Sequence, residues 1–365
     1  MVVYLILIFI LLILGLGLKC DYSKRGRKSF LIISFLILTG LSGFRAYSVG
    51  VDTSSYVVMF NNIDYINFLQ SRYERGFLVF LKLIHTFTDN PTVFLMISSA
   101  ICVGAVCCFI YKYSADPLFS ILLYITLRAY FFQMTGIRQT LATALVMMAF
   151  SLLMERRSLR KNIISLMLLF LATQFHSMSI VAIIPYVILF FPRIRESIIV
   201  SPSWNCKIAI IVAGVSFIAY PLIMRLVTIV TPQYAHYFSD TWGESNYNAA
   251  LFKMLIQLIF LIVGTIYLRN TEISNIEHFS MIMIFISLIT ETLSMRMEIW
   301  GRLTGMFSIY TGILYAPLFT ANIKNGGNRI IVKSSIFAFS LLYLLITFIF
   351  RPEWDGAVPY ILQWY

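Results

Sequence analysis

One histidine interrupts a long apolar part of the sequence. His176 lies between two apolar segments of about fourteen residues each. Fourteen helical residues rise only about 21 Å, whereas the hydrocarbon core of a bilayer is about 30 Å thick. If these segments are membrane helices, the turn that carries His176 lies in a depression, where an imidazole that titrates near neutral pH could accept a proton. The alternative is a histidine bonded to a neighbouring helix.

A second candidate residue begins another apolar segment. Arg138 and Gln139 follow Gly136 and Ile137 at its start. The first turn of a helix offers unpaired N–H groups and the positive end of the helix dipole, which favour an anion. The guanidinium of Arg138 adds planar donors that suit phosphate oxygens. The alternative is an arginine that extends to the lipid headgroups.

Further ionisable side chains lie in polar runs between apolar segments. One run supplies Arg45, Asp52 and Tyr56, and a second supplies Glu74 just before a short apolar segment. Arg302 follows a short turn late in the chain. Carboxylates, arginines and a phenol are the groups that acid–base chemistry and anion binding require. The alternative is that these residues belong to ordinary solvated loops.

Arg128 and Glu291 lie within apolar segments, near the ends that we place outside the cytoplasm. Embedded ionisable residues usually line a cavity or pair with one another. We expect these two to form a structural pair, and we assign neither of them a catalytic role.

The composition indicates a membrane protein. The chain is 59% hydrophobic and 12% charged, with a mean hydropathy of +0.85, whereas an ordinary globular domain is about 25% charged. Such a chain satisfies its backbone hydrogen bonds in a bilayer by forming helices. The five cysteines show no spacing typical of a disulfide framework or a zinc site. We therefore predict an all-α polytopic bundle with no metal.

About twelve segments are apolar enough to span the membrane. They are residues 1–18, 29–44, 91–110, 117–133, 137–154, 162–175, 178–191, 207–228, 250–268, 279–295, 303–319 and 333–350. The first has no leading charge and no small-residue cleavage site, which indicates a span and not a signal peptide. Residues 77–88 are apolar but short, which favours an interfacial or re-entrant helix. The whole chain, 1–365, is predicted to be one transmembrane domain.

The distribution of charge predicts the orientation. Twelve alternating spans place 17 of the 28 Lys and Arg, but only 6 of the 16 Asp and Glu, on one face, which is then cytoplasmic. This accounts for the net charge of +12 without nucleic acid. Both termini and the loops 44–90 and 229–249 are then extracytoplasmic. If residues 162–191 formed one bent helix, everything downstream would be reversed.

The polar runs also carry a family resemblance. The chain resembles the EpsG family, within the Wzy-type bacterial polysaccharide polymerases, from about residue 30 to 320. The similar residues are Arg45, Gly50-Val51-Asp52, Tyr56, Glu74-Arg75-Gly76-Phe77, Gly136-Ile137-Arg138-Gln139, Ala142, Phe175-His176-Ser177 and Arg302-Leu303. No single motif is specific, and the order and spacing of the motifs carry the resemblance.

The resemblance implies an enzyme of the bacterial plasma membrane, with a helical bundle like that of GT-C-type membrane glycosyltransferases. It would join undecaprenyl-diphosphate-linked oligosaccharide repeat units into exopolysaccharide, capsule or O-antigen on the extracytoplasmic face, without a cofactor. Chain-length regulator and flippase proteins of the same pathway are further candidate partners. The candidate residues for binding the substrate and its diphosphate are Arg45, Tyr56, Arg138, Gln139 and Arg302. The candidate bases are His176 first, then Glu74 and Asp52.

Other functions remain open at the level of sequence. A flippase for lipid-linked oligosaccharide would need charges along a path from both faces. A ligase that moves a finished glycan would use nearly the same site. An acyltransferase would need a histidine near the cytoplasmic side, and a scaffold role leaves His176 unexplained.

Overall fold

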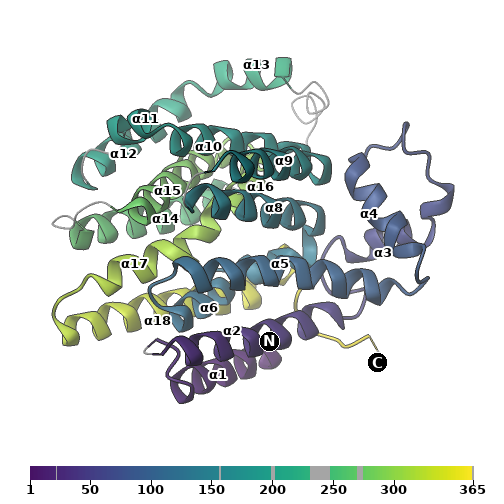
Figure 1. Cartoon of the computed structure of the whole chain (residues 1–365), viewed down its shortest axis with the longest axis horizontal. Coiled ribbons are helices and arrows are strands. Elements are labelled where there is room, and N and C mark those ends of the chain that lie inside the picture. The colour runs from purple at the N-terminus through teal and green to yellow at the C-terminus, as the bar shows by residue number, and fades with distance from the viewer. Residues whose placement is uncertain (22, 156–157, 199–201, 231–246, 269–273, 364–365) are drawn as a thin grey trace. The chain divides into compact units, whose positions relative to one another are not determined.

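The computed structural model describes residues 1–363 except 22, 156–157, 199–201, 231–246 and 269–273. Arg156, Arg157 and most of the predicted loop 229–249 therefore lie outside the described residues. Helices make up nearly all of the regular structure that is described (Figure 1). The chain forms two compact units. Unit 1 comprises Met1–Tyr186 and Asn325–Tyr365, and unit 2 comprises Val187–Lys324.

Unit 1 contains the N-terminal helices and the last long helix. Its helices are α1 Val2–Gly17, α2 Lys24–Gly43, α3 Thr53–Asn61, η1 Ile63–Tyr65, α4 Arg75–His85, α5 Pro91–Tyr113, α6 Pro117–Thr126, α7 Ala129–Thr135, α8 Ile137–Met154, α9 Leu159–Phe175, η2 Ser177–Ala182, α18 Gly326–Phe350 and η6 Pro352–Trp354. A further helix, α10 Ile183–Phe190, runs across the boundary between the units.

Unit 2 is also helical in its described part. Its helices are α11 Pro192–Ile198, α12 Pro202–Ile218, α13 Tyr220–Val230, α14 Tyr247–Leu268, α15 Asn275–Ser294, α16 Ile299–Tyr310, the π-helix η5 Thr311–Tyr315 and α17 Ala316–Ala321. Most of α15 is buried, and it packs against α12, α14 and α16.

Several helices begin where the sequence supplies a capping side chain. Ser23, Asp116, Ser158 and Asn325 each accept a hydrogen bond from a backbone N–H in the first turn of the helix that follows. Ser274 forms a reciprocal capping box with the first turn of α15. A cap of this kind contributes about 1 kcal/mol to helix stability. These caps fix the starts of α2, α6, α9, α15 and α18.

The described residues contain seven helices long and apolar enough to cross a membrane, or up to nine if α6–α7 and α12–α13 each form one bent span. These nine coincide with nine of the twelve predicted spans. The other three predicted spans correspond to shorter segments: α1, α9 and Ser177–Phe190. A polytopic helical membrane protein is therefore confirmed, and the number twelve stays a prediction.

The basic loops of unit 1 meet at one end of its helices. Arg27, at the start of α2, donates a hydrogen bond to the carbonyl of Tyr111 at the end of α5 (3.5 Å). Glu155, just after α8, pairs with Lys112 and with Lys161 at the start of α9. The starts of α2 and α9 therefore lie beside the ends of α5 and α8. This is the grouping that alternating spans predict.

The polar runs that carry the candidate residues meet at the opposite end of unit 1. The hydroxyl of Tyr47, after α2, contacts that of Thr92 at the start of α5 (3.2 Å). The N–H of Val51, just before α3, donates to the hydroxyl of Thr135 at the end of α7 (3.3 Å). Figure 1 shows α3 and α4 together at this end of α5. The helices of unit 1 thus separate the basic loops from the candidate site.

The chain breaks sharply at His176. There α9 ends with His176 in an extended conformation (φ −155°, ψ 111°), and η2 begins at the next residue and packs back against α8 and α9. The structure therefore favours two segments over one long helix bent at Pro185. His176 lies in the turn between them, as the sequence predicts.

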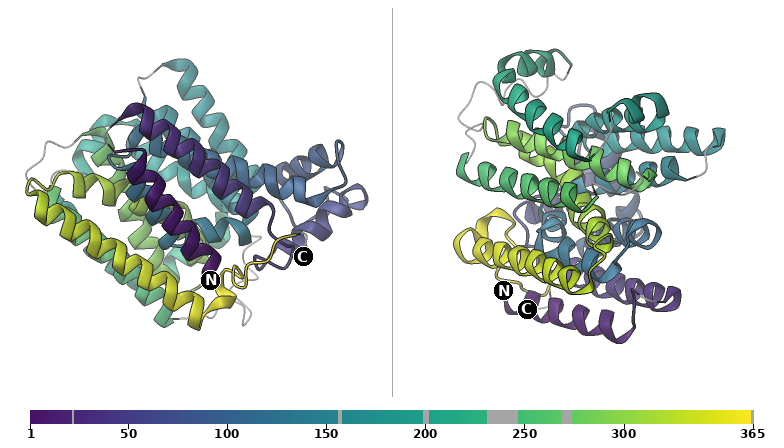
Figure 2. Two further views of the ribbon diagram at one scale, coloured as in Figure 1. Left: turned by 90° about the horizontal axis from the view of Figure 1, so that it is seen from below. Right: turned by 90° about the vertical axis from the view of Figure 1, so that its left-hand side faces the viewer.

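The C-terminal tail, residues 351–363, forms backbone hydrogen bonds with the loop that follows α2. The N–H of Ala46 donates to the carbonyl of Ile361 (2.8 Å), and that of Gly50 donates to the carbonyl of Gly356 (2.8 Å). Figure 2 shows the yellow tail passing beside the start of the purple helix α1, where the hydroxyl of Tyr4 donates to the carbonyl of Ala357 (2.8 Å). The tail thus holds the segment that leads into α3.

Candidate active site

Glu74 connects three segments of unit 1 that lie far apart in the sequence. It is the N-cap residue of α4. One carboxylate oxygen pairs with Nη1 of Arg138, at the second position of α8. The other, Oε1, accepts hydrogen bonds from the backbone N–H of Ser177 (2.9 Å) and from its hydroxyl (3.1 Å). Glu74 therefore holds the starts of α4, α8 and η2 together.

A glycine allows this close approach. Gly76, in the first turn of α4, lies against the end of α9, and a Cβ placed there would come within 2.6 Å of the Cβ of Gln174 and 2.8 Å of its carbonyl oxygen. A larger residue would push α4 away from the turn that carries His176. Gly76 thus lets Glu74 reach Ser177.

His176 lies beside the same carboxylate. Its Nδ1 is 3.7 Å from Oε1 of Glu74, and the side chains of both residues are 15% exposed. This separation is longer than a hydrogen bond, but catalytic contacts are often long in structures without substrate. A carboxylate beside an imidazole can orient the ring and stabilise its protonated form. Glu74 is placed to serve His176 in this way.

Arg138 is fixed from three directions. Nη1 pairs with Glu74, Nε donates to the hydroxyl of Tyr56 (3.3 Å), and the guanidinium carbon lies 4.6 Å from the centre of the Tyr73 ring. Within the described residues no protein group accepts a hydrogen bond from Nη2. Because its side chain is 22% exposed, Arg138 can present this donor to an anion.

The charge state of Glu74 follows from its contacts. Burial alone would raise its pKa, but Arg138, the N–H of Ser177 and His176 all lower it, and the net effect is a pKa below the ordinary value. Glu74 is therefore ionised at neutral pH. An ionised carboxylate held by an arginine is a weak base, so the geometry favours His176 over Glu74 as the group that accepts a proton.

We call this group of residues the Glu74 cluster. Its members are Tyr56, Tyr73, Glu74, Arg138, His176 and Ser177. Four were candidate site residues in the sequence, whereas Tyr73 and Ser177 were not. Both directly flank an ionisable candidate, and that adjacency was the signal that could have identified them.

Arg45 lies deeper, with a buried guanidinium. It is 1% exposed and donates to the carbonyls of Ser42, Val49 (3.2 Å) and Met134 (3.0 Å) and to the hydroxyl of Thr53 (3.3 Å). Its donors therefore hold protein carbonyls together at the start of α3.

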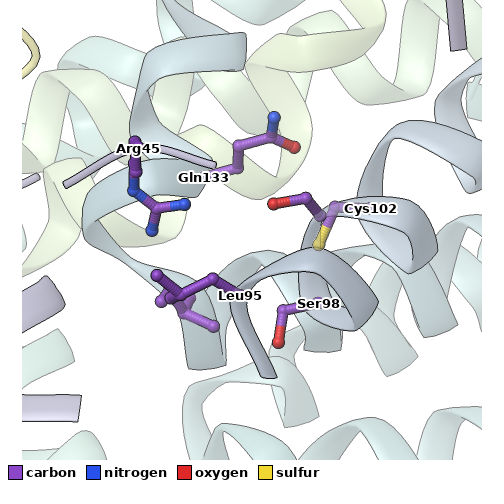
Figure 3. Close-up of a pocket in the computed structure, with 7 residues that line it drawn as sticks. Arg45, Leu95, Ser98, Cys102 and Gln133 are labelled. Atoms are coloured by element: carbon purple, nitrogen blue, oxygen red, sulfur yellow. The ribbon is translucent and has the colours of Figure 1, made fainter. Parts of the chain in front are cut away.

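A small pocket adjoins Arg45. Figure 3 shows Arg45 and Gln133 on one side of it and Leu95, Ser98 and Cys102, all from α5, on the other. The pocket is too narrow to admit a water molecule. This pocket therefore does not admit a sugar or a diphosphate.

The remaining candidates take different positions. Asp52 is exposed just before α3, one turn from Tyr56, and acts electrostatically on its hydroxyl. Gln139 is buried in α8. Arg302 is exposed on α16 of unit 2. Among the described residues, no group of three or more His, Cys, Asp or Glu is arranged to hold a metal ion.

The expected pair of Arg128 with Glu291 is wrong. Arg128 instead pairs with Asp355 of the C-terminal tail (Nε 2.8 Å and Nη2 2.7 Å from Oδ2) and donates to the hydroxyl of Tyr343 (3.1 Å). Glu291 lies in unit 2 and accepts a hydrogen bond from Ser294 (3.2 Å). The tail folds back onto the rest of unit 1, so that Arg128 finds its partner 227 residues away in the sequence. A prediction of the membrane spans alone cannot identify such a partner.

Comparison with known proteins gives one result. No curated protein and no solved structure matches the chain, so the expected likeness to GT-C-type glycosyltransferases stays a prediction. The model of the EpsG family matches residues 28–362, a range that contains the whole Glu74 cluster. The chain therefore belongs to the EpsG family, a family of Wzy-like polymerases.

Proposed function

We propose that this protein joins polyprenyl-diphosphate-linked oligosaccharide repeat units into a polysaccharide on the outer face of the bacterial plasma membrane. The observation that carries the proposal is the Glu74 cluster, in which Glu74 brings Arg138 and His176 together from three segments. The family and the many apolar helices support a membrane polymerase.

The reaction requires two kinds of assistance. A hydroxyl oxygen of the incoming unit forms a bond to the anomeric carbon of the growing chain. The bond from that carbon to the diphosphate oxygen breaks, and the diphosphate leaves with the electron pair. Negative charge therefore develops on the leaving group and needs fixed donors, while the attacking hydroxyl must give its proton to a base.

The Glu74 cluster offers one residue for each task. Nη2 of Arg138 donates to the departing diphosphate, since the other donors of this guanidinium are held by Glu74 and Tyr56. His176 takes the proton of the attacking hydroxyl, and the ionised Glu74 stabilises the imidazolium that forms. Asp52, whose charge acts on the hydroxyl of Tyr56, is a further carboxylate for contacts with sugar hydroxyls.

The other predicted residues take supporting roles in this proposal. Arg45 positions the start of α3, and with it Tyr56, through its buried hydrogen bonds. Gln139 follows Arg138 in α8 and is buried. That Arg302, on α16 of unit 2, binds the diphosphate stays a prediction from the sequence.

The separation of charge in unit 1 supports the outer face. The basic starts of α2 and α9 share one end of the unit, and the Glu74 cluster lies at the other. Because basic loops remain in the cytoplasm, the cluster then faces outward. Undecaprenyl is the carrier lipid that we propose.

The test is polymerisation by purified protein in lipid vesicles that contain a polyprenyl-diphosphate-linked repeat unit. We expect a ladder of products from the wild type, none from His176→Gln, and a strongly reduced ladder from Arg138→Gln. The matched control is Arg160→Ala, an exposed arginine at the basic end, which should give a normal ladder. A wild type that forms no ladder, or that only moves lipid-linked units between leaflets, would overturn the proposal.

A further inference from the structure

One face of α4 leaves apolar side chains uncovered. Val79, Leu83 and Phe87 are 56, 58 and 82% exposed. They recur every four residues and so form one narrow strip along the helix and its end. The opposite face, which includes Phe77 and Leu81, packs fully into the core beneath it. The strip is therefore a second apolar face that unit 1 does not cover.

Polar side chains border this strip on one side. Arg75, Lys82 and Thr86 are exposed and lie about 20 to 100° around the helix from the apolar strip, given 100° per residue. Lys82 pairs with Asp64 of η1. A helix with an apolar face beside a basic edge suits the boundary between lipid headgroups and acyl chains.

The connection to α5 places this strip at a lipid surface. Phe87 precedes Pro91, the first residue of α5, by four residues, which span at most about 14 Å. The 23 residues of α5 form a candidate membrane span and rise about 35 Å, slightly more than the hydrocarbon core of about 30 Å. The first turn of α5 therefore lies at a membrane boundary, and Phe87 lies within reach of it.

We infer that α4 lies in the headgroup boundary of the leaflet, with Val79, Leu83 and Phe87 against acyl chains, and that it thereby sets the height of the Glu74 cluster. Glu74 is the N-cap of this helix and holds Arg138. The depth of the strip therefore fixes the level of Arg138 relative to the phosphates of the surrounding lipids. This inference rests on the proposed function for its catalytic consequence, because a lipid diphosphate would arrive at that level.

The first experiment measures depth without requiring activity. Single cysteines at positions 79, 83 and 87, in a background without the five native cysteines, carry spin labels in phospholipid vesicles. We expect these labels to be accessible to oxygen and shielded from a water-soluble nickel chelate. Controls at Lys82, on the polar edge, and at Asp89, whose side chain is 91% exposed, should show the reverse. Nickel access at all three strip positions would overturn the inference.

The second experiment measures the catalytic consequence. Leu83→Asp places a charge at the lipid boundary, and Leu83→Phe keeps the strip apolar. We expect Leu83→Asp to raise the KM for a long-chain lipid donor about tenfold, with little change for a short-chain donor that is soluble in water. Leu83→Phe should match the wild type. If Leu83→Asp lost the same activity with both donors, the positioning role of α4 would be refuted. The proposed function would still stand as long as the wild-type protein forms a ladder.

Discussion

The pair of Glu74 and Arg138 can be tested as a structural contact and as a catalytic one in the same set of variants. Glu74→Gln and Arg138→Gln each leave one charge without its partner. Breaking a buried ion pair costs about 3 to 5 kcal/mol. The side chains of Glu74 and Arg138 are 15 and 22% exposed, and Ser177 still donates to position 74. We therefore expect the free energy of unfolding of each single variant to fall by about 2 kcal/mol.

The double variant Glu74→Gln/Arg138→Gln separates the two roles. It removes both charges, and its two amides can bond to each other, so its stability should return to within about 1 kcal/mol of the wild type. Its activity should not return, since loss of a donor to a developing negative charge costs about 100- to 1,000-fold in rate. The measurements are thermal unfolding in lipid nanodiscs and the rate of ladder formation. A double variant that regains both stability and activity would show that the pair is only structural.

Three further outcomes follow from particular contacts. Arg45→Met leaves several buried carbonyls without donors and should destabilise unit 1 by about 3 kcal/mol, as measured by thermal unfolding; lost activity with normal stability would instead place Arg45 at the substrate. Asp355→Asn removes the partner of buried Arg128 and should cost about 3 kcal/mol, which limited proteolysis of the tail would detect. The pKa of Glu74 in the folded protein is lowered from 4.5. Its contribution to the stability of the fold should therefore be fully present above pH 4.5 and lost as the pH falls through the pKa of the folded state. The stability difference from Glu74→Gln should therefore not decline between about pH 8 and pH 5, and it should shrink in more acidic buffer; a decline already at pH 7 would contradict the lowered pKa.

Much of the fold could be predicted because hydrophobic length determines which segments can cross a bilayer. The apolar runs of α5, α8 and α14 have the length of a span, so counting residues located them. The turn at His176, between two short apolar segments, predicted two spans there, and α9 does end just before this residue. The bends between α6 and α7 (50°) and between α12 and α13 (75°) were not foreseen. Arg128, at the first bend, adopts a positive φ of 72°, which a side chain of its type rarely does.

The candidate site was partly predictable for a different reason. Only 12% of the residues in this chain are charged, so Glu74, Arg138 and His176 were conspicuous. The alternating spans also placed all three on the same face of the membrane. Their mutual contacts depend on tertiary packing, in particular on the close approach at Gly76. The buried position of Arg45 could not be foreseen, because the carbonyls that it binds belong to segments up to 89 residues away.

In the proposed reaction, Arg138 and its neighbours hold the lipid diphosphate. The most direct measurement is photo-cross-linking of the vesicle-reconstituted protein with a polyprenyl diphosphate that carries a photoreactive group beside the phosphates, followed by mapping of the labelled peptides. We expect labels within residues 52–56, 73–77, 136–139 and 174–178, and unlabelled polyprenyl diphosphate should suppress them. Labels confined to the basic end, around residues 24–28 and 158–161, would contradict the proposal.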